Sequence, residues 1–87
     1  MKLPRVYEIV APLTVFEVLR TVRRPARRKI EEFLQRLVRQ PSLAGEFEAP
    51  AEDGRVHQVK IVGGWLVSYW IDHAVCEVRV SSIEAIE

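Results

Sequence analysis

The sequence predicts a small α+β domain: an N-terminal strand, an α-helical hairpin, and then a three-stranded antiparallel β-meander. Three observations lead to this fold class. Apolar residues recur with a helical period between positions 15 and 38, and the pattern is interrupted near Pro25. Three runs rich in β-branched and aromatic residues follow position 54. A chain of 87 residues has room for one core, so we expect a single domain over residues 1–87.

The first strand is expected over residues 6–11, where a proline ends it. The first helix then has a complete start signal. Thr14 is the expected N-cap, Glu17 its capping-box partner, and Leu13 with Val18 a hydrophobic staple. The apolar stripe of this helix consists of Val15, Val18, Leu19 and Val22.

The second helix is expected from Pro25 to about Gln40. Proline is favoured in the first turn of a helix, which places the break between the helices at Arg23 and Arg24. Pro41 ends the second helix. Its apolar stripe consists of Ala26, Ile30, Phe33, Leu34, Leu37 and Val38. Because two short helices cannot bury both stripes against each other, a sheet is the expected partner layer.

The acidic segment 42–54 contains an Asp53-Gly54 turn and is predicted to be a surface loop. Residues 56–62, 65–71 and 75–80 are predicted to form the meander. Cys76, the single cysteine, lies inside the last of these runs, and we expect it to be a small buried apolar residue.

The charges are unevenly distributed along the chain. Residues 1–43 hold ten Lys or Arg and four Glu, whereas residues 44–87 hold three Lys or Arg and eight acids. This asymmetry predicts an anionic partner for the first half, either nucleic acid or an acidic polypeptide, although a solvated helical surface gives the same pattern. No apolar run approaches the roughly 20 residues that span a membrane, so we expect a cytoplasmic protein with no membrane partner.

Several short motifs accompany this order of elements. They are Arg39-Gln40-Pro41, Leu43-Ala44-Gly45, Gln58-Val59-Lys60-Ile61, Gly64-Trp65, Leu66-Val67-Ser68-Tyr69 and Ile71-Asp72. Together with the element order, they resemble the RelE/ParE toxin family over most of the chain. Members of the RelE type cleave messenger RNA in the ribosome and so inhibit translation. Members of the ParE type inhibit DNA gyrase, and an antitoxin protein neutralises both types.

The resemblance therefore implies the toxin of a type II toxin-antitoxin system, acting as an endoribonuclease on ribosome-bound mRNA and neutralised by a cognate antitoxin. The alternative is a non-catalytic binding module, either a degenerate family member or a ParE-like inhibitor of DNA gyrase. The resemblance implies no cofactor.

RNA cleavage through the 2′-hydroxyl requires a base, cations that stabilise the phosphorane, and an acid for the leaving 5′-oxygen. RelE supplies lysines on its second strand, an arginine after a glycine-tyrosine pair, and an arginine and a tyrosine beyond the last strand. Here Lys60 matches one strand lysine, whereas Gln58 stands at the other and Leu66 at the arginine position. Residues 81–87 contain neither arginine nor tyrosine. These departures favour the binding module, unless His57 or His73 compensates.

The length of the turn after Val62 decides which side chains point away from the helices. A two-residue Gly63-Gly64 turn would place Lys60 on the buried face. We expect a three-residue turn with a left-handed glycine, because an unpaired buried lysine is costly. The outward side chains would then be Gln58, Lys60, Leu66, Ser68, Trp70, Glu77, Arg79 and Ser81.

The candidate site residues follow from this register. Lys60 and Arg79 are the candidate catalytic cations, and His57 and Glu77 the candidate proton-transfer groups. Residues expected to bind RNA or the antitoxin are Trp70, Gln58, Ser68, Ser81, Arg55, Arg27 and Arg28. A solvated sheet face is the simpler alternative. Neither histidine has neighbours at metal-ligand spacing, so no metal site is predicted.

Overall fold

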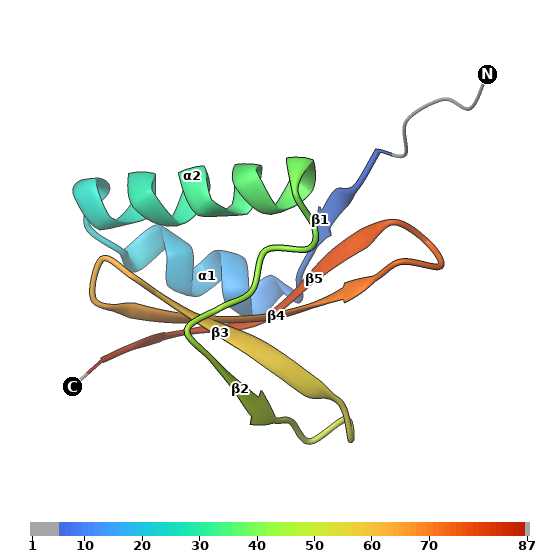
Figure 1. Cartoon of the computed structure of the whole chain (residues 1–87). Helices are drawn as coiled ribbons and strands as arrows, with labels where there is room; N and C mark the ends of the chain where they lie inside the picture. Colours follow the sequence, from blue (N-terminus) through green and yellow to red (C-terminus); the bar gives the residue numbers. More distant parts are fainter. Residues whose placement is uncertain (1–5, 87) are drawn as a thin grey trace.

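Two helices cover one face of a five-stranded sheet (Figure 1). The structure is a computed structural model and describes residues 6–86. The elements are β1 Glu8–Val10, α1 Leu13–Thr21, α2 Arg24–Arg39, β2 Phe47–Pro50, β3 Val56–Val62, β4 Trp65–Asp72 and β5 Glu77–Ala85. The strand order is β1-β5-β4-β3-β2, with β1 parallel to β5 and every other pair antiparallel. The predicted α+β class and the meander of β3, β4 and β5 are confirmed.

The helical hairpin forms close to where the sequence predicts it, with a different start. The expected Thr14 N-cap is wrong: the helix begins at Leu13, and Pro12 is the N-cap in an extended conformation without a side-chain cap. The Pro12 carbonyl accepts a hydrogen bond from the Val15 N–H at 3.0 Å, which starts the helix without a side-chain cap. Leu13 is 72% exposed, so it does not form a hydrophobic staple.

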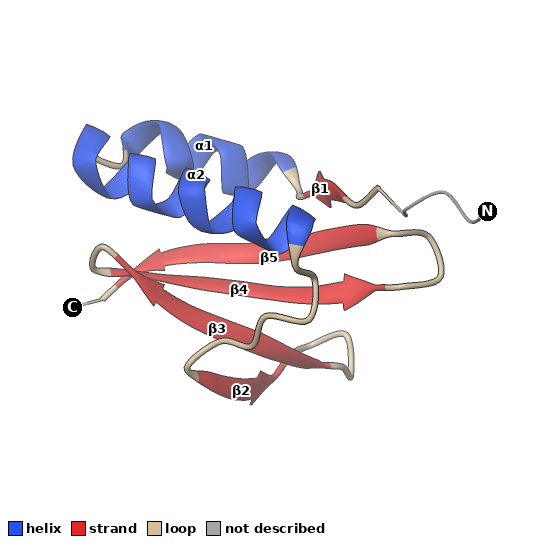
Figure 2. Cartoon of the chain, turned by 45° about the horizontal axis from the view of Figure 1, so that its top comes forward, coloured by secondary structure: helices blue, strands red, loops and turns tan. Residues whose placement is uncertain are grey.

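Both predicted stripes point toward the sheet. Val15 and Val22 from the first helical segment are buried, as are Ile30, Phe33 and Leu37 from α2. Figure 2 shows both helices on the same side of the sheet. Within residues 6–86, neither helix is long and apolar enough to cross a membrane.

Strand β2 was not expected, because it lies in the acidic segment predicted to be a loop. It pairs with β3 at the edge of the sheet, from Phe47 opposite Val59 to Pro50 opposite Val56. An edge strand tolerates a proline, since one side of its backbone needs no partner in the ladder. The sequence signals of a loop therefore correspond here to a short polar edge strand.

The turn between β3 and β4 has two residues, so the predicted three-residue register is wrong. Val62 pairs with Trp65, and both Gly63 (φ 57°) and Gly64 (φ 86°) have left-handed conformations. Positive φ at both central residues defines a type I′ turn, whose twist suits a tight hairpin. As a consequence, alternate residues of β3 point to the opposite sides from those predicted.

The pairing of β5 with β4 contains a register shift, which changes the alternation of the β5 side chains between the two sides of the sheet. Tyr69 pairs with Val80 while Ser68 pairs with Ser82, which leaves Ser81 as an extra residue. Val78, Val80 and Ile83 are therefore all in the core, although their spacing is not regular. Cys76 precedes the strand in a turn with φ 55° and is half-buried, so the expected buried strand cysteine is wrong.

Tyr69 is fully buried at the centre of the sheet. Its hydroxyl donates a hydrogen bond to the Leu43 carbonyl at 2.9 Å and so fixes the segment that follows α2. Its ring meets Phe33 edge to face, with centroids 5.6 Å apart. Burial raises the pKa of Tyr69 to about 12, and the charge of Glu46 acts in the same direction.

We predict that Leu37→Ala lowers the free energy of unfolding by about 2 to 5 kcal/mol, because it leaves a cavity in a fully buried position. Leu34→Ala is the matched control, since Leu34 is only partly buried against the same core. Urea denaturation measures both changes. Equal losses for the two variants would contradict an orientation of α2 that buries Leu37 more deeply than Leu34.

We also predict that Tyr69 makes the fold sensitive to alkaline pH. The folded state keeps the phenol protonated to about pH 12, whereas an unfolded tyrosine ionises near 10. Stability should therefore fall as pH rises through this interval. At neutral pH, Tyr69→Phe should lower the free energy of unfolding by about 0.5 to 1.5 kcal/mol, because it removes the hydrogen bond to Leu43. When the pH is raised through the interval, the free energy of unfolding of the variant should fall less than that of the wild type. Urea denaturation at neutral pH and at alkaline pH measures both changes.

Candidate functional site

The sheet face that points away from the helices is called the open face here. Three strands contribute its side chains: His57, Val59 and Ile61 from β3; Leu66, Ser68 and Trp70 from β4; Glu77, Arg79 and Ser81 from β5. The predicted outward residues of β4 and β5 are therefore confirmed. The predicted outward residues of β3, Gln58 and Lys60, lie on the helix side instead.

Lys60 is accommodated on the helix side because it has a partner. Its Nζ donates to Glu46 Oε1 at 2.8 Å and lies 5.8 Å from the centroid of the Phe33 ring. The hydrogen bond from Lys60, followed by the Ile61 N–H, lowers the pKa of Glu46. Gln58 accepts from the Gly45 N–H and donates to Glu48, each at 2.9 Å. Both side chains thus fix the segment around β2 and do not join the open face.

His57 is the buried polar residue of the open face, with 5% of its surface exposed. Its Nδ1 lies 2.9 Å from the Ser81 Oγ, and its Nε2 lies 3.0 Å from the Asp53 Oδ2. The Ser81 hydroxyl in turn donates to the Ser68 carbonyl at 3.1 Å. These four residues, named here the His57 network, come from the turn after β2 and from strands β3, β4 and β5.

Asp53 is held by the turn that connects β2 and β3. Its Oδ1 accepts a hydrogen bond from the Arg55 N–H at 2.9 Å, in the geometry of an Asx turn. This bond is the largest cause that lowers the pKa of Asp53, and the hydrogen bond and charge of His57 act in the same direction. The sequence predicts Asp53 only as a turn residue. Its position four residues before His57, on the other side of a turn, is the sequence feature that could have indicated the contact between the two side chains.

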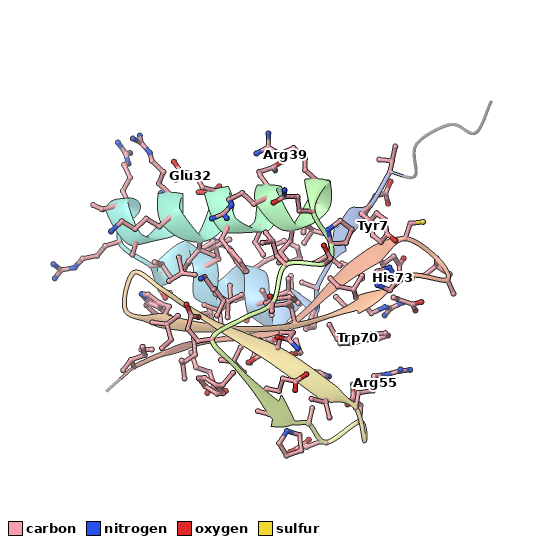
Figure 3. All side chains as sticks on the ribbon, in the orientation of Figure 1. Tyr7, Glu32, Arg39, Arg55, Trp70 and His73 are labelled. Atoms are coloured by element: carbon pink, nitrogen blue, oxygen red, sulfur yellow. The ribbon has the colours of Figure 1, made fainter. Side chains whose placement is uncertain are left out.

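Trp70 lies close to two guanidinium groups. The Arg55 Cζ is 4.0 Å from the ring centroid, the Arg79 Cζ is 5.7 Å from it, and the His57 ring centroid is 6.5 Å away. Figure 3 shows Arg55 and Trp70 side by side. The predicted binding residues Arg55 and Trp70 therefore lie together, with cation–π contacts that prearrange them.

Arg79 provides a cation beside this ring. Its Nη2 donates to Glu77 Oε1 at 2.6 Å, and its side chain is 43% exposed. Within residues 6–86, the buried Arg79 Nε has no hydrogen-bond partner. A buried donor without a partner is costly, and an anionic ligand on this face would offer it an acceptor.

Two shallow depressions, of about 450 and 530 Å³, meet at the His57 network. Asp53, His57 and Ser81 line both. The first also has Trp70 and Arg79 in its wall. Ser68 lines the second. The structure thus brings His57, Ser68, Ser81, Trp70 and Arg79 to one site.

The other predicted residues lie elsewhere. Arg27 and Arg28 belong to a basic layer on α2, which also includes Arg24, Arg36 and Arg39 around a separate shallow depression. In Figure 3, Arg39 and Glu32 of this helix point away from the sheet. His73 Nδ1 is 2.8 Å from the Tyr7 hydroxyl near β1, outside the His57 network. Among residues 6–86, no three metal-ligating side chains gather into a group that could hold a metal.

The comparisons with known proteins concern the fold. No protein-family profile and no curated protein matches the sequence. A chain in the crystal structure of the archaeal RelE-RelB complex from Pyrococcus horikoshii OT3 matches this structure with a TM-score of 0.74. The match covers 93% of this chain and 96% of that chain, at 13% sequence identity.

The chain has a RelE-like fold.

On this RelE-like fold, the sequence resemblance and the structural comparison agree. The comparison also covers nearly the whole length of both chains. The open face carries a buried histidine, two guanidinium groups and an aromatic ring, and cations beside an aromatic ring suit an anionic ligand that contains bases.

We predict that Arg55 shields Trp70 from solvent. In a Trp65→Phe background, Trp70 is the single tryptophan, and Arg55→Ala should increase quenching of its fluorescence by acrylamide because the stacked guanidinium is lost. Lys60→Ala removes a cation from the opposite side and should leave the quenching unchanged. Unchanged quenching in the Arg55 variant would contradict the stacked arrangement.

Proposed function

We propose that this protein is the toxin of a type II toxin-antitoxin system and acts in the cytoplasm under the control of a cognate antitoxin. The RelE-like fold supports this proposal, since the matched chain belongs to a structure named as a complex of RelE with RelB. The motifs that resemble the RelE/ParE family support it independently, because they were identified from the sequence.

The activity that we propose is cleavage of ribosome-bound mRNA. The observation that carries it is the assembly of His57, Arg79 and Trp70 on the open face. In this reaction His57 supplies the proton for the leaving 5′-oxygen, Arg79 stabilises the phosphorane, and Trp70 stacks on a base. The carboxylate of Glu77, next to Arg79, accepts the proton of the 2′-hydroxyl.

The antitoxin that we propose is acidic where it contacts the basic layer on α2. Arg24, Arg27, Arg28, Arg36 and Arg39 outnumber the two glutamates that line the same depression. Complementary charge accelerates association and makes affinity depend on salt.

A second candidate function is a non-catalytic binding module, including a ParE-like inhibitor of DNA gyrase. Leu66 on the open face favours it, because RelE has an arginine at the corresponding position. The ion pair between Arg79 and Glu77 also favours it, since a paired arginine is less available to a phosphate.

Induced expression in bacteria tests the proposal, with and without the adjacent reading frame. Growth arrest that the adjacent gene relieves is the expected result. Mapping of mRNA 5′ ends should then show cleavage within translated frames. Growth arrest without RNA cleavage, together with loss of DNA supercoiling, would support the gyrase inhibitor instead. Normal growth, together with no binding between this protein and the product of the adjacent reading frame, would contradict the proposal that the protein is a toxin.

We predict that Arg79→Gln slows RNA cleavage by about 100-fold to 1,000-fold, the usual cost of removing one charge-stabilising donor. Lys60→Gln removes a cation of the same sheet from the helix side and should cleave at the wild-type rate. Primer extension on translating ribosomes measures both rates, and circular dichroism checks folding. If the Lys60 variant loses as much activity, RNA binds on the helix side near Glu46.

We predict that the product of the adjacent reading frame binds with an affinity that falls as salt increases. Arg28→Gln combined with Arg36→Gln should weaken binding and reduce the salt dependence, because both side chains belong to the basic layer. Gln35→Ala alters the same depression without changing its charge and is the control. Calorimetry at several salt concentrations measures this, and a salt-independent affinity would argue against the electrostatic contact.

A further inference from the structure

The acceptors around His57 suit a proton on each ring nitrogen. The Ser81 hydroxyl has one hydrogen, and it donates this hydrogen to the Ser68 carbonyl. With this orientation of the hydroxyl, the Ser81 Oγ is an acceptor for a hydrogen on His57 Nδ1, 2.9 Å away. Ionised Asp53 is an acceptor for a hydrogen on Nε2, 3.0 Å away. The geometry therefore suits a ring that donates from both nitrogens.

The surroundings of the ring are consistent with one positive charge. Asp53 in the turn after β2 faces Nε2 directly at 3.0 Å. Two cations lie near the network, Arg55 from the same turn and Arg79 from β5, each close to Trp70. Glu52 and Glu84 line the second depression. When the ring is protonated, the Asp53 carboxylate in contact with it is the counterion.

The ring itself is nearly inaccessible, with 5% exposure. Ser81 is more exposed than the ring and lies where the two depressions meet. An RNA phosphate in the first depression, beside Arg79, would therefore reach the Ser81 hydroxyl more readily than either nitrogen of His57.

We propose that Ser81 is the catalytic residue that transfers the proton of His57 to the substrate, and that Asp53 is a positioning residue that stores this proton on the ring. This inference rests on the proposed RNA cleavage. When the 2′-oxygen attacks phosphorus, the bond from phosphorus to the 5′-oxygen breaks. The hydroxyl proton of Ser81 moves to the 5′-oxygen, and the Nδ1 proton of His57 moves to the Ser81 Oγ.

The protons balance over the whole reaction. The 2′-hydroxyl proton moves to the carboxylate of Glu77, and the products are a 2′,3′-cyclic phosphate and a 5′-hydroxyl. The ring becomes a neutral imidazole. Its remaining hydrogen stays on Nε2, which continues to donate to Asp53. Water then accepts the proton from Glu77 and supplies one to His57, which restores the starting state.

The first test measures the protons directly and does not depend on activity. The ¹⁵N chemical shifts of the purified protein are recorded near the ordinary histidine pKa of about 6.5, with His73 as the internal reference. We expect both nitrogens of His57 to be protonated in the wild type and in Ser81→Ala, and a larger neutral fraction in Asp53→Asn. An unprotonated Nδ1 in the wild type would overturn the proposed direction of transfer.

The second test measures cleavage of mRNA on translating ribosomes. Ser81→Ala should be slower by about 100-fold to 10,000-fold, the range for loss of a proton-transfer group, while Ser81→Thr should restore most of the rate. Ser82→Ala, in the neighbouring position that pairs with Ser68, is the control and should cleave normally.

The two tests separate this inference from the proposed function. If the wild type cleaves RNA and Ser81→Ala cleaves equally well, the relay is wrong and the nuclease remains. If the wild type does not cleave, the nuclease and the relay both fail, and the ¹⁵N shifts still decide whether Asp53 holds an imidazolium.

Discussion

The two-residue turn at Gly63-Gly64 is the constraint on which the open face depends. Both glycines have positive φ, and this conformation pairs Val62 with Trp65. Because side chains alternate along a strand, one additional turn residue would exchange the two sides of β3. The tight turn therefore places His57 on the open face and Lys60 beside the helices. An added Cβ at Gly63 would also lie 3.2 Å from Ala26, so the close approach of α2 is a second reason for glycine at this position.

Two regions of the chain then meet at His57: the turn before β3, which contains Asp53, and β5, whose Ser81 lies 24 positions after His57. The turn after β2 supplies Asp53, and the irregular pairing of β5 supplies Ser81 as an extra residue while Val80 and Ile83 stay in the core. Strand β2 contributes indirectly, because its pairing with β3 sets the position of that turn. The polar network thus depends on features that a regular meander would not contain.

The two layers of the molecule have different chemical character. The helical layer presents arginines around a shallow depression, whereas the open face combines a buried histidine, an aromatic ring and paired charges. A polyanionic partner on the helices and an RNA substrate on the sheet would therefore contact different faces. This separation explains why the uneven charge distribution in the sequence does not by itself locate the candidate site.

The sequence by itself determined the order of the main elements, the two apolar helix stripes, the meander and the outward residues of β4 and β5, because periodicity and turn chemistry are local properties. It did not determine strand β2, because the pairing of β2 with β3 outweighs local loop signals. It also did not determine which side chains of β3 point toward the helices. The buried-lysine argument failed because Glu46, fourteen positions away in the chain, pairs with Lys60. Only the tertiary structure decided that Ser81 joins His57 and Asp53 in a network, since a contact between residues 24 positions apart leaves no periodic pattern in the sequence.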